Sequence, residues 1–365
     1  MEDYPLVANT YTECKALTDD DIKAYFKFKQ IKGEGAFGKV YSAVPTDLAL
    51  QEIGSDLPSL VAIKQVVVRR DVKSQFIKVY RSTMTSELLN LQRLKTASLD
   101  SAVDFYGCFG GRDSLYIIMG LAAGRQLEAI LDDDYQGYMI LSADERLSIL
   151  RELAKAITEF HSKGFVHRDL KPENVFVDLV RRPGQASKVT LKILDYGYVC
   201  STEGLSTKDD NCRALRGTPE FLDPQALVPK GNWDLMVAAD WWAFGQIAFQ
   251  TFTGFTATTE VAGSRIKSLH IGKVVSRIGN FYKPDANKLI KRHHVPETIA
   301  IMLANLLDPE APIEARPSPE EIRQIIGVPD ETARSTQASD DKLSARKQSV
   351  RQSPILAAIA QEQQW

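Results

Sequence analysis

One eight-residue stretch constrains this chain more than any other. Residues His167 to Asn174 read His-Arg-Asp-Leu-Lys-Pro-Glu-Asn, which places a carboxylate at Asp169, an ammonium group at Lys171 and an amide at Asn174. A carboxylate can take the proton of an attacking hydroxyl, while a lysine and a metal held by the amide offset charge on transferring oxygens. The stretch therefore predicts phosphoryl transfer, provided that a phosphate-binding loop, an anchoring lysine and a metal-binding aspartate occur elsewhere.

A glycine-rich turn at residues 33–38, Gly-Glu-Gly-Ala-Phe-Gly, supplies the phosphate-binding loop. Period-two alternation from Tyr25 to Ile31 precedes it and a β-branched and aromatic run from Lys39 to Val44 follows it, so we expect a strand on each side. Between a strand and a helix this spacing is typical of dinucleotide binding, whereas between two strands it predicts a flap over phosphates. Taken alone, the motif fits an ordinary glycine-rich hairpin equally well.

Lys64 supplies the anchoring lysine, within an otherwise apolar strand expected over residues 60–68. A lysine in such a strand either extends to solvent or has a buried partner. Residues 71–95 have helical spacing, and Glu87 lies near the apolar face of that helix. We expect Glu87 to pair with Lys64 while the lysine reaches nucleotide phosphates; the alternative is a solvated glutamate.

Asp195 supplies the metal-binding aspartate, because it ends an apolar strand expected over residues 189–194 and precedes Tyr196-Gly197. Magnesium prefers one or two carboxylates together with substrate oxygens. We expect Asn174 and Asp195 to share the metal. The alternative is a simple turn at the end of the strand.

Composition excludes few classes of function. The formal charge of −2 gives no reason to expect a nucleic-acid partner. No run of 18 or more apolar residues is present and the N-terminus is acidic, so we expect a soluble protein with no membrane span and no cleaved signal. The oligomeric state stays open.

The four cysteines, Cys14, Cys108, Cys200 and Cys212, lack metal-binding spacing. We expect free thiols in a reducing, cytoplasmic setting, with nuclear access or delivery into a host cell left open. Cys200 and Cys212 flank one loop and are close enough in sequence to bridge. We favour two unrelated thiols, because disulfides are rare in the cytosol.

With these residues in order, the chain resembles the eukaryotic-type protein kinase family over roughly Phe26 to Gly327, and its serine/threonine branch through Lys171 and Gly217-Thr218-Pro219-Glu220. The resemblance implies an α+β, bilobal fold. An N-lobe at 26–119 would hold a small antiparallel β-sheet with one main helix, and a larger, mainly helical C-lobe would span 120–327. Residues 1–25 would be a lead-in, residues 45–60 an inserted loop, and residues 328–365 a polar, disordered tail.

The resemblance also implies a role for each motif. Asp169 would be the catalytic base, Lys171 would neutralise the γ-phosphate, Lys64 with Glu87 would position the α- and β-phosphates, and Asn174 with Asp195 would hold Mg²⁺, or Mn²⁺ in its place. Asp240 would tether the backbone of the catalytic loop. The residues expected around ATP are Gly33, Glu34, Gly35, Ala36, Phe37, Gly38, Val40, Ala62, Lys64, Met119, Gly120, Ala122 and Phe176.

Several positions depart from the family pattern. Tyr196 replaces phenylalanine, so its hydroxyl needs a partner if it is buried. Gln225 replaces the glutamate that pairs with a late arginine, here Arg316, so we expect a weaker tether. Gly120 replaces a common glutamate, and Ala214 stands where many members carry a phosphothreonine.

The sequence therefore predicts an ATP- and Mg²⁺-dependent serine/threonine protein kinase with a protein substrate. The alternative from another class is a pseudokinase, a nucleotide-binding scaffold that acts by protein contact. It requires a broken catalytic set, and none of the five residues Lys64, Glu87, Asp169, Asn174 and Asp195 is missing. A small-molecule kinase is disfavoured by the peptide-docking pattern at residues 217–220.

Overall fold

The computed structural model describes residues 15–16, 21–35, 38–67, 74–110, 114–206, 212, 216–227, 232–258 and 283–328. Ala36 and Phe37 of the glycine-rich turn, Ala214 and residues 329–365 of the expected tail lie outside the described residues. One compact unit reaches Ile326, and it is the unit that carries the candidate site.

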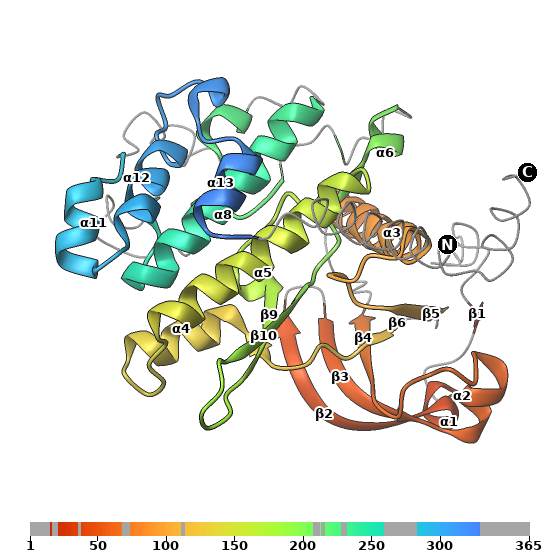
Figure 1. Cartoon of the computed structure of the whole chain (residues 1–365). Helices are drawn as coiled ribbons and strands as arrows, with labels where there is room; N and C mark the ends of the chain where they lie inside the picture. Colours follow the sequence, from red (N-terminus) through yellow and green to blue (C-terminus); the bar gives the residue numbers. More distant parts are fainter. Residues whose placement is uncertain are drawn as a thin grey trace, which may run out of the picture. The chain divides into compact units, whose positions relative to one another are not determined.

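The N-terminal part of this unit is built on a six-stranded sheet (Figure 1). Five strands pair antiparallel: β2 (Phe26–Gly35), β3 (Gly38–Pro45), β4 (Val61–Val67), β5 (Phe105–Gly110) and β6 (Ser114–Gly120). A short strand, β1 (Lys15–Ala16), adds to β5 in parallel. Helix α3 (Ser74–Ala97) is the long helix of this part. The prediction of an antiparallel sheet with one main helix is thus confirmed, with β1 as an addition.

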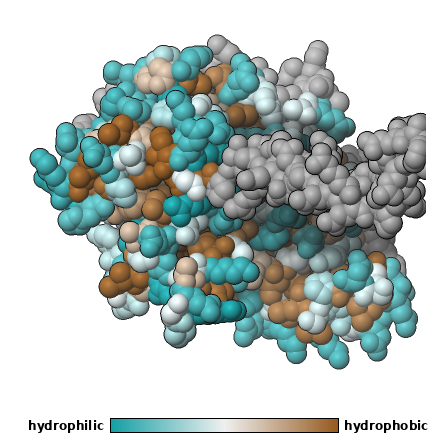
Figure 2. Space-filling view, viewed as in Figure 1, coloured by the Kyte–Doolittle hydropathy of each residue, from teal (hydrophilic) through white to brown (hydrophobic). Residues whose placement is uncertain are grey.

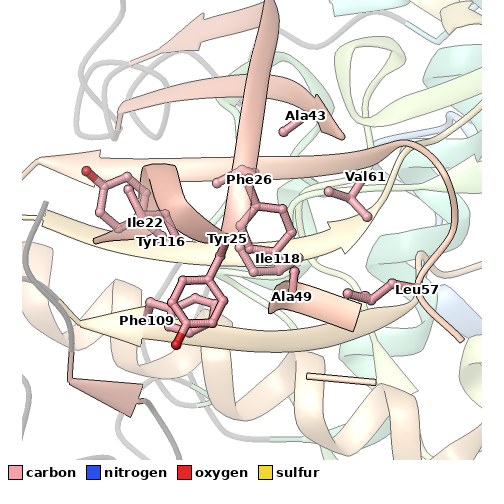
Figure 3. Packing of buried hydrophobic residues seen from close by; sticks show 11 residues of the cluster. Ile22, Tyr25, Phe26, Ala43, Ala49, Leu57, Val61, Phe109, Tyr116 and Ile118 are labelled. Carbon is pink, nitrogen blue, oxygen red and sulfur yellow. The ribbon is translucent and has the colours of Figure 1, made fainter. Parts of the chain in front are cut away.

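The inserted stretch at 45–60 is more than a loop, which corrects the prediction. It contains helix α2 (Asp47–Glu52), whose Ala49 is buried with Leu57 in the core beneath the sheet, next to helix α1 (Ile22–Tyr25) (Figure 3). Tyr25 Oη donates a 2.7 Å hydrogen bond to Glu52 Oε2, which ties the two helices together. The prolines and polar residues at the ends of the stretch indicated a loop. They gave no sign that the helix between them buries an apolar face.

The C-terminal part is mainly helical, as predicted. Its helices are α4 (Leu127–Tyr135), α5 (Ala143–Ser162), α6 (Thr202–Ser206), α8 (Trp233–Thr253), α11 (Ala286–His293), α12 (Glu297–Leu306) and α13 (Pro319–Ile325). Helix α5 begins with a capping box between Ser142 and Glu145, which satisfies two N-terminal backbone amides. Most of the second half of α8 is buried, so α8 forms the centre of this part.

Short strands carry the motifs to one place. Strand β8 (Phe165–Val166) leads into His167, and β9 (Val175–Val180) begins directly after Asn174. Strand β10 (Lys188–Ile193) returns antiparallel to β9 and ends just before Asp195, while β7 (Arg125–Gln126) pairs with the other edge of β9. The hairpin therefore brings Asn174 and Asp195 to the same end of the sheet.

The surface drawn in Figure 2 mixes hydrophilic and hydrophobic residues among its coloured atoms. Within the described ranges, no helix is long and apolar enough to cross a membrane.

Candidate active site

A cavity of about 550 Å³ brings the predicted motifs together. The glycine-rich strands, β4, α3 and the end of β6 form part of its wall. The catalytic loop, Asp195 and Tyr196 form another part. The predicted residues that line it are Gly33, Glu34, Gly38, Val40, Ala62, Lys64, Glu87, Met119, Gly120, Ala122, Asn174, Phe176 and Asp195. Gly35 is described but is not among the lining residues, and Asp169 and Lys171 lie in the loop beside it.

The cavity also has walls that the motifs did not indicate. Val103, Leu121, Gln126 and Leu194 line it. Val103, Leu121 and Leu194 lie in connections and Gln126 ends the two-residue strand β7, and none of these positions carries a distinctive sequence signal. A second cavity of about 680 Å³, beside the end of α3, holds none of the predicted site residues.

Lys64 points inward to Glu87, not outward to solvent. Its Nζ lies 2.6 and 2.7 Å from the two carboxylate oxygens of Glu87, whose side chain is only 3% exposed. Burial raises the pKa of the Glu87 carboxyl, and the charge of Lys64 opposes that rise. The pair links the middle of β4 to α3, so the lysine's position depends on where that helix sits.

The carboxylate of Asp169 is fixed by a set of hydrogen bonds. Its Oδ1 accepts from both the backbone N and the Oγ1 of Thr218, each at 2.7 Å, and its Oδ2 accepts from Asn174 Nδ2 at 3.3 Å. Lys171 Nζ lies 3.4 Å from Asp169 Oδ2 and donates to Thr218 Oγ1 at 2.9 Å. A carboxylate held this way presents its oxygens in one direction, which suits it to orient a hydroxyl.

Lys171 stays cationic at this position. Burial acts to lower the pKa of its ammonium group, but the carboxylates of Asp169, Glu173 and Asp195 outweigh burial and raise it. The loop thus keeps a positive charge next to the Asp169 carboxylate.

Asp240 of α8 holds the backbone of the catalytic loop, as predicted. Its carboxylate accepts hydrogen bonds from the backbone N atoms of His167 and Arg168, both at 2.8 Å, and contacts His161 Nε2 at 2.9 Å. Burial opposes the charge on Asp240, yet these bonds lower the pKa of the carboxyl. Arg168 has φ 69°, a strained conformation for a non-glycine residue. The two bonds from Asp240 hold the loop in that conformation.

The residues predicted to hold a metal fit Mg²⁺. Asn174 Nδ2 donates to Asp169 O at 2.8 Å, which leaves the side-chain oxygen Oδ1 of Asn174 as the ligand for a hard cation. Asp195 lines the same cavity. Leu194 N donates to Asn174 O at 2.8 Å and keeps the two positions adjacent. The described residues contain no cluster of three or more histidine, cysteine or acidic side chains.

Comparison with known proteins agrees with this geometry. The family model described as "Protein kinase domain" matches residues 26–325. The chain belongs to the protein kinase family.

Its relatives include ribosomal protein S6 kinase alpha-3 from Homo sapiens, 26% identical over 268 residues, covering 73% of this chain and 32% of that protein. The cAMP-dependent protein kinase catalytic subunit from Dictyostelium discoideum is 27% identical over 271 residues, covering 73% of this chain and 36% of that protein. Ribosomal protein S6 kinase alpha-2 from Homo sapiens is 28% identical over 232 residues, covering 63% and 27%. The kinase chain thus spans about a third of the length of these relatives.

In this kinase, the hydroxyl of Tyr196 finds the partners that burial requires. It donates to Ile193 O at 2.6 Å and accepts from Val103 N at 2.9 Å, and burial raises its pKa. Asn90 Nδ2 of α3 donates to the carbonyls of Tyr196 and Val199 at 2.8 and 2.9 Å. The segment after Asp195 is therefore held by α3 and by the backbone of Val103 and Ile193.

The prediction of a weakened tether at Arg316 is wrong. Arg316 forms a buried, two-pronged ion pair with Asp223, at 2.7 and 3.2 Å. Gln225 Nε2 instead donates to the carbonyls of Pro309 and Ala311. The acidic partner of Arg316 is thus Asp223, two residues before Gln225. Arg316 therefore keeps a charged partner in this part of the kinase.

The prediction of free thiols is also wrong. Cys200 and Cys212 form a disulfide with a Cα–Cα distance of 5.3 Å, and Cys108 is disulfide-bonded as well. The prediction rested on the rarity of disulfides in the cytosol. That rarity says nothing about which cysteines the fold brings together.

Proposed function

We propose that this chain is a serine/threonine protein kinase that transfers the γ-phosphoryl group of ATP to protein hydroxyls with Mg²⁺. The fixed carboxylate of Asp169, held between Lys171 and Thr218 beside the nucleotide-sized cavity, carries the proposal. A general base must be held within reach of the proton that it accepts, and Asp169 is held by four contacts from Thr218, Asn174 and Lys171.

Each residue then has one task in the reaction. Asp169 orients the attacking hydroxyl and accepts its proton, and Lys171 offsets charge that develops on the transferring oxygens. Lys64, positioned by Glu87, contacts the α- and β-phosphates. Val40, Ala62 and Phe176 pack against the adenine ring. Asn174 and Asp195 would hold Mg²⁺, which would neutralise charge on the phosphates; Mn²⁺ would suit the same oxygen ligands.

The preference for serine and threonine rests on Lys171 and Thr218. Their hydrogen bond joins the catalytic loop to residues 217–220, the stretch expected to receive the substrate peptide. Similarity to ribosomal protein S6 kinase alpha-3 and to the cAMP-dependent protein kinase catalytic subunit supports the same branch. A protein substrate is therefore proposed rather than a small molecule.

Transfer of labelled γ-phosphate from Mg·ATP to a generic basic protein and to the chain itself tests the proposal, with phosphoamino-acid analysis of the product. We expect phosphoserine or phosphothreonine with the wild type and none with Asp169→Ala. Nucleotide binding without transfer in either protein would contradict the proposal and favour the pseudokinase alternative. Phosphotyrosine alone would refute the serine/threonine assignment while leaving the kinase chemistry in place.

A further inference from the structure

A disulfide closes part of the segment between Asp195 and Gln225, which we call the activation segment. Cys200 and Cys212 are joined across a sequence separation of 12 residues. Their side chains are 1% and 2% exposed, and they pack with Val166 and with Trp233 and Met236 of α8. The bridge is thus part of a small apolar core that includes Val166, the residue before the catalytic loop.

One end of the bridge is fixed to the strand that enters the catalytic loop. Strand β11 (Cys200–Ser201) pairs antiparallel with β8, and Cys200 lies opposite Val166, the residue before His167. Thr202 N also donates to Gly164 O at 3.0 Å. Cys200 therefore cannot move without moving the start of the catalytic loop.

The other end lies close in sequence to the residue that meets Asp169. Cys212 is six residues before Thr218, whose backbone N and Oγ1 both bond Asp169 Oδ1. Gly217 has φ 119°, and a Cβ there would lie 2.7 Å from Arg168 O. The segment approaches the catalytic loop so closely at this point that a small displacement would break the contacts.

The position at which many family members carry a phosphothreonine cannot accept a phosphate in this chain. Residue 214 is alanine, which has no hydroxyl to accept a phosphate. A covalent bridge restricts the chain without any charge, because it limits the conformations available to residues on either side.

We propose that the Cys200–Cys212 disulfide positions the activation segment against the catalytic loop in place of a phosphorylated residue at 214, so that phosphoryl transfer requires the oxidised pair. This inference rests on the proposed kinase function. Cys200 and Cys212 are positioning residues, since they act through Thr218 and Asp169 and not on the substrate.

Reduction of the Cys200–Cys212 disulfide removes this restraint on the activation segment. A small dithiol breaks the sulfur–sulfur bond, each protein sulfur gains one electron and one proton, and the dithiol closes to its cyclic disulfide. The product is a pair of thiols, and Cys212 is then held beside Cys200 by noncovalent packing alone.

The test uses the full chain, purified oxidised, with the bridge verified by non-reducing peptide mapping. The kcat and KM for a peptide substrate and the affinity for Mg·ATP are measured for the oxidised wild type, the dithiothreitol-reduced wild type and the Cys200→Ala/Cys212→Ala variant. Cys108→Ala is the matched control, since reduction also cleaves the disulfide of Cys108.

We expect kcat/KM for the peptide to fall about tenfold or more on reduction and in the double variant, with unchanged Mg·ATP affinity. Reoxidation should restore the wild type but not the double variant, and Cys108→Ala should remain active until it is reduced. A merely structural bridge would lower nucleotide affinity as well. If the double variant fails to fold, the comparison of kcat/KM between the oxidised and the reduced wild type tests the inference.

Equal kcat/KM in the oxidised and reduced wild type would overturn the inference and leave the proposed function intact. Absence of transfer by the oxidised wild type under all conditions would refute the proposed function, and the inference with it.

Discussion

The hydroxyl of Tyr196 adds hydrogen bonds that hold the segment next to Asp195 in place. The side chain is buried, and its Oη bonds the backbone of Val103 on one side and Ile193 on the other. A phenylalanine at this position would fill the same space and make neither bond. Tyr196 therefore adds polar contacts to the packing that holds Asp195 toward the cavity.

Tyr196→Phe should destabilise the fold by about 1–3 kcal/mol, because it leaves the Val103 N–H and the Ile193 carbonyl without their partner in a buried site. Urea unfolding measures the change. Tyr138→Phe is the control, since Tyr138 is 79% exposed, and it should leave the stability unaltered. Equal stability of Tyr196→Phe and wild type would show that the two bonds contribute nothing.

Glu145 links the start of α5 to the β9–β10 hairpin and makes stability depend on pH. Arg181 bonds both of its oxygens, at 2.7 and 2.8 Å, and with Ser142 and Ser187 it lowers the pKa of Glu145 from 4.5 to about 2. Because the folded state holds the ionised form, the stabilisation is present above pH 4.5 and is lost as the pH falls toward 2.

Glu145→Gln should therefore cost about 1–3 kcal/mol near neutral pH, and the difference from wild type should shrink near pH 3. The free energy of unfolding in urea at the two pH values measures it. A difference that stays constant between them would contradict the assignment of the stabilisation to the ionised carboxylate.

At the scale of elements, α3 connects the nucleotide lysine to the activation segment. Glu87 pairs with Lys64, Asn90 bonds the carbonyls of Tyr196 and Val199, and Arg93 lies 3.4 Å from Glu203 of α6. These residues lie on successive turns of one helix. A shift of α3 would therefore disturb the lysine and the activation segment together.

Glu87→Gln should lower kcat/KM for phosphate transfer about tenfold or more, because an uncharged amide holds the Lys64 ammonium less firmly in its phosphate-binding position. Glu152→Gln is a matched control, since Glu152 pairs with Lys155 on the surface of α5. Steady-state kinetics compare the two. Equal loss in both variants would point to a general effect of charge removal, and no loss in Glu87→Gln would remove the ion pair from the mechanism.

The elements that could be predicted from sequence are those with a local signal. Period-two alternation indicated β2, a β-branched and aromatic run indicated β3, and an apolar run indicated β4, while Ser142 with Glu145 marked the start of α5. Helix α2 was missed because it is short and gains its stability from burying Ala49 against the sheet, a contact that local propensity does not encode.

At the scale of the whole molecule, a buried ion pair joins residues 93 positions apart. Arg316 bonds Asp223, and its guanidinium lies 4.6 Å from the ring centre of Trp242 in α8. The pair fixes the activation segment to the last part of the kinase domain. Both side chains are almost fully buried, so each charge depends on the other.

Asp223→Ala should destabilise the fold by about 3–5 kcal/mol, because it leaves Arg316 as an uncompensated buried charge. Gln225→Ala removes only neutral hydrogen bonds and should cost about 1 kcal/mol. The Asp223→Ala/Arg316→Met double variant should cost less than the sum of its single changes. Additive losses in that thermodynamic cycle would contradict the pairing.

The candidate site was predictable as a set of motifs, and its long-range partners were not. The sequence indicated Lys64 with Glu87 and Asn174 with Asp195, because the family pattern supplies both pairs. It misassigned the partner of Arg316 and missed the disulfide, since both depend on how distant segments meet. The cytoplasmic location stays a prediction, and the disulfides remove the thiol argument for it, because such bonds persist mainly in oxidising compartments.

The most direct test of the account is a single-turnover measurement of phosphate transfer by the oxidised chain with bound Mg·ATP and saturating peptide. Wild type and Asp169→Asn are compared at equal nucleotide occupancy, so that the chemical step alone differs. The account predicts that Asp169→Asn binds Mg·ATP as wild type does but transfers at a rate lower by about 100-fold or more. Equal rates in the two proteins would contradict the role of Asp169, and with it the proposed function of the site.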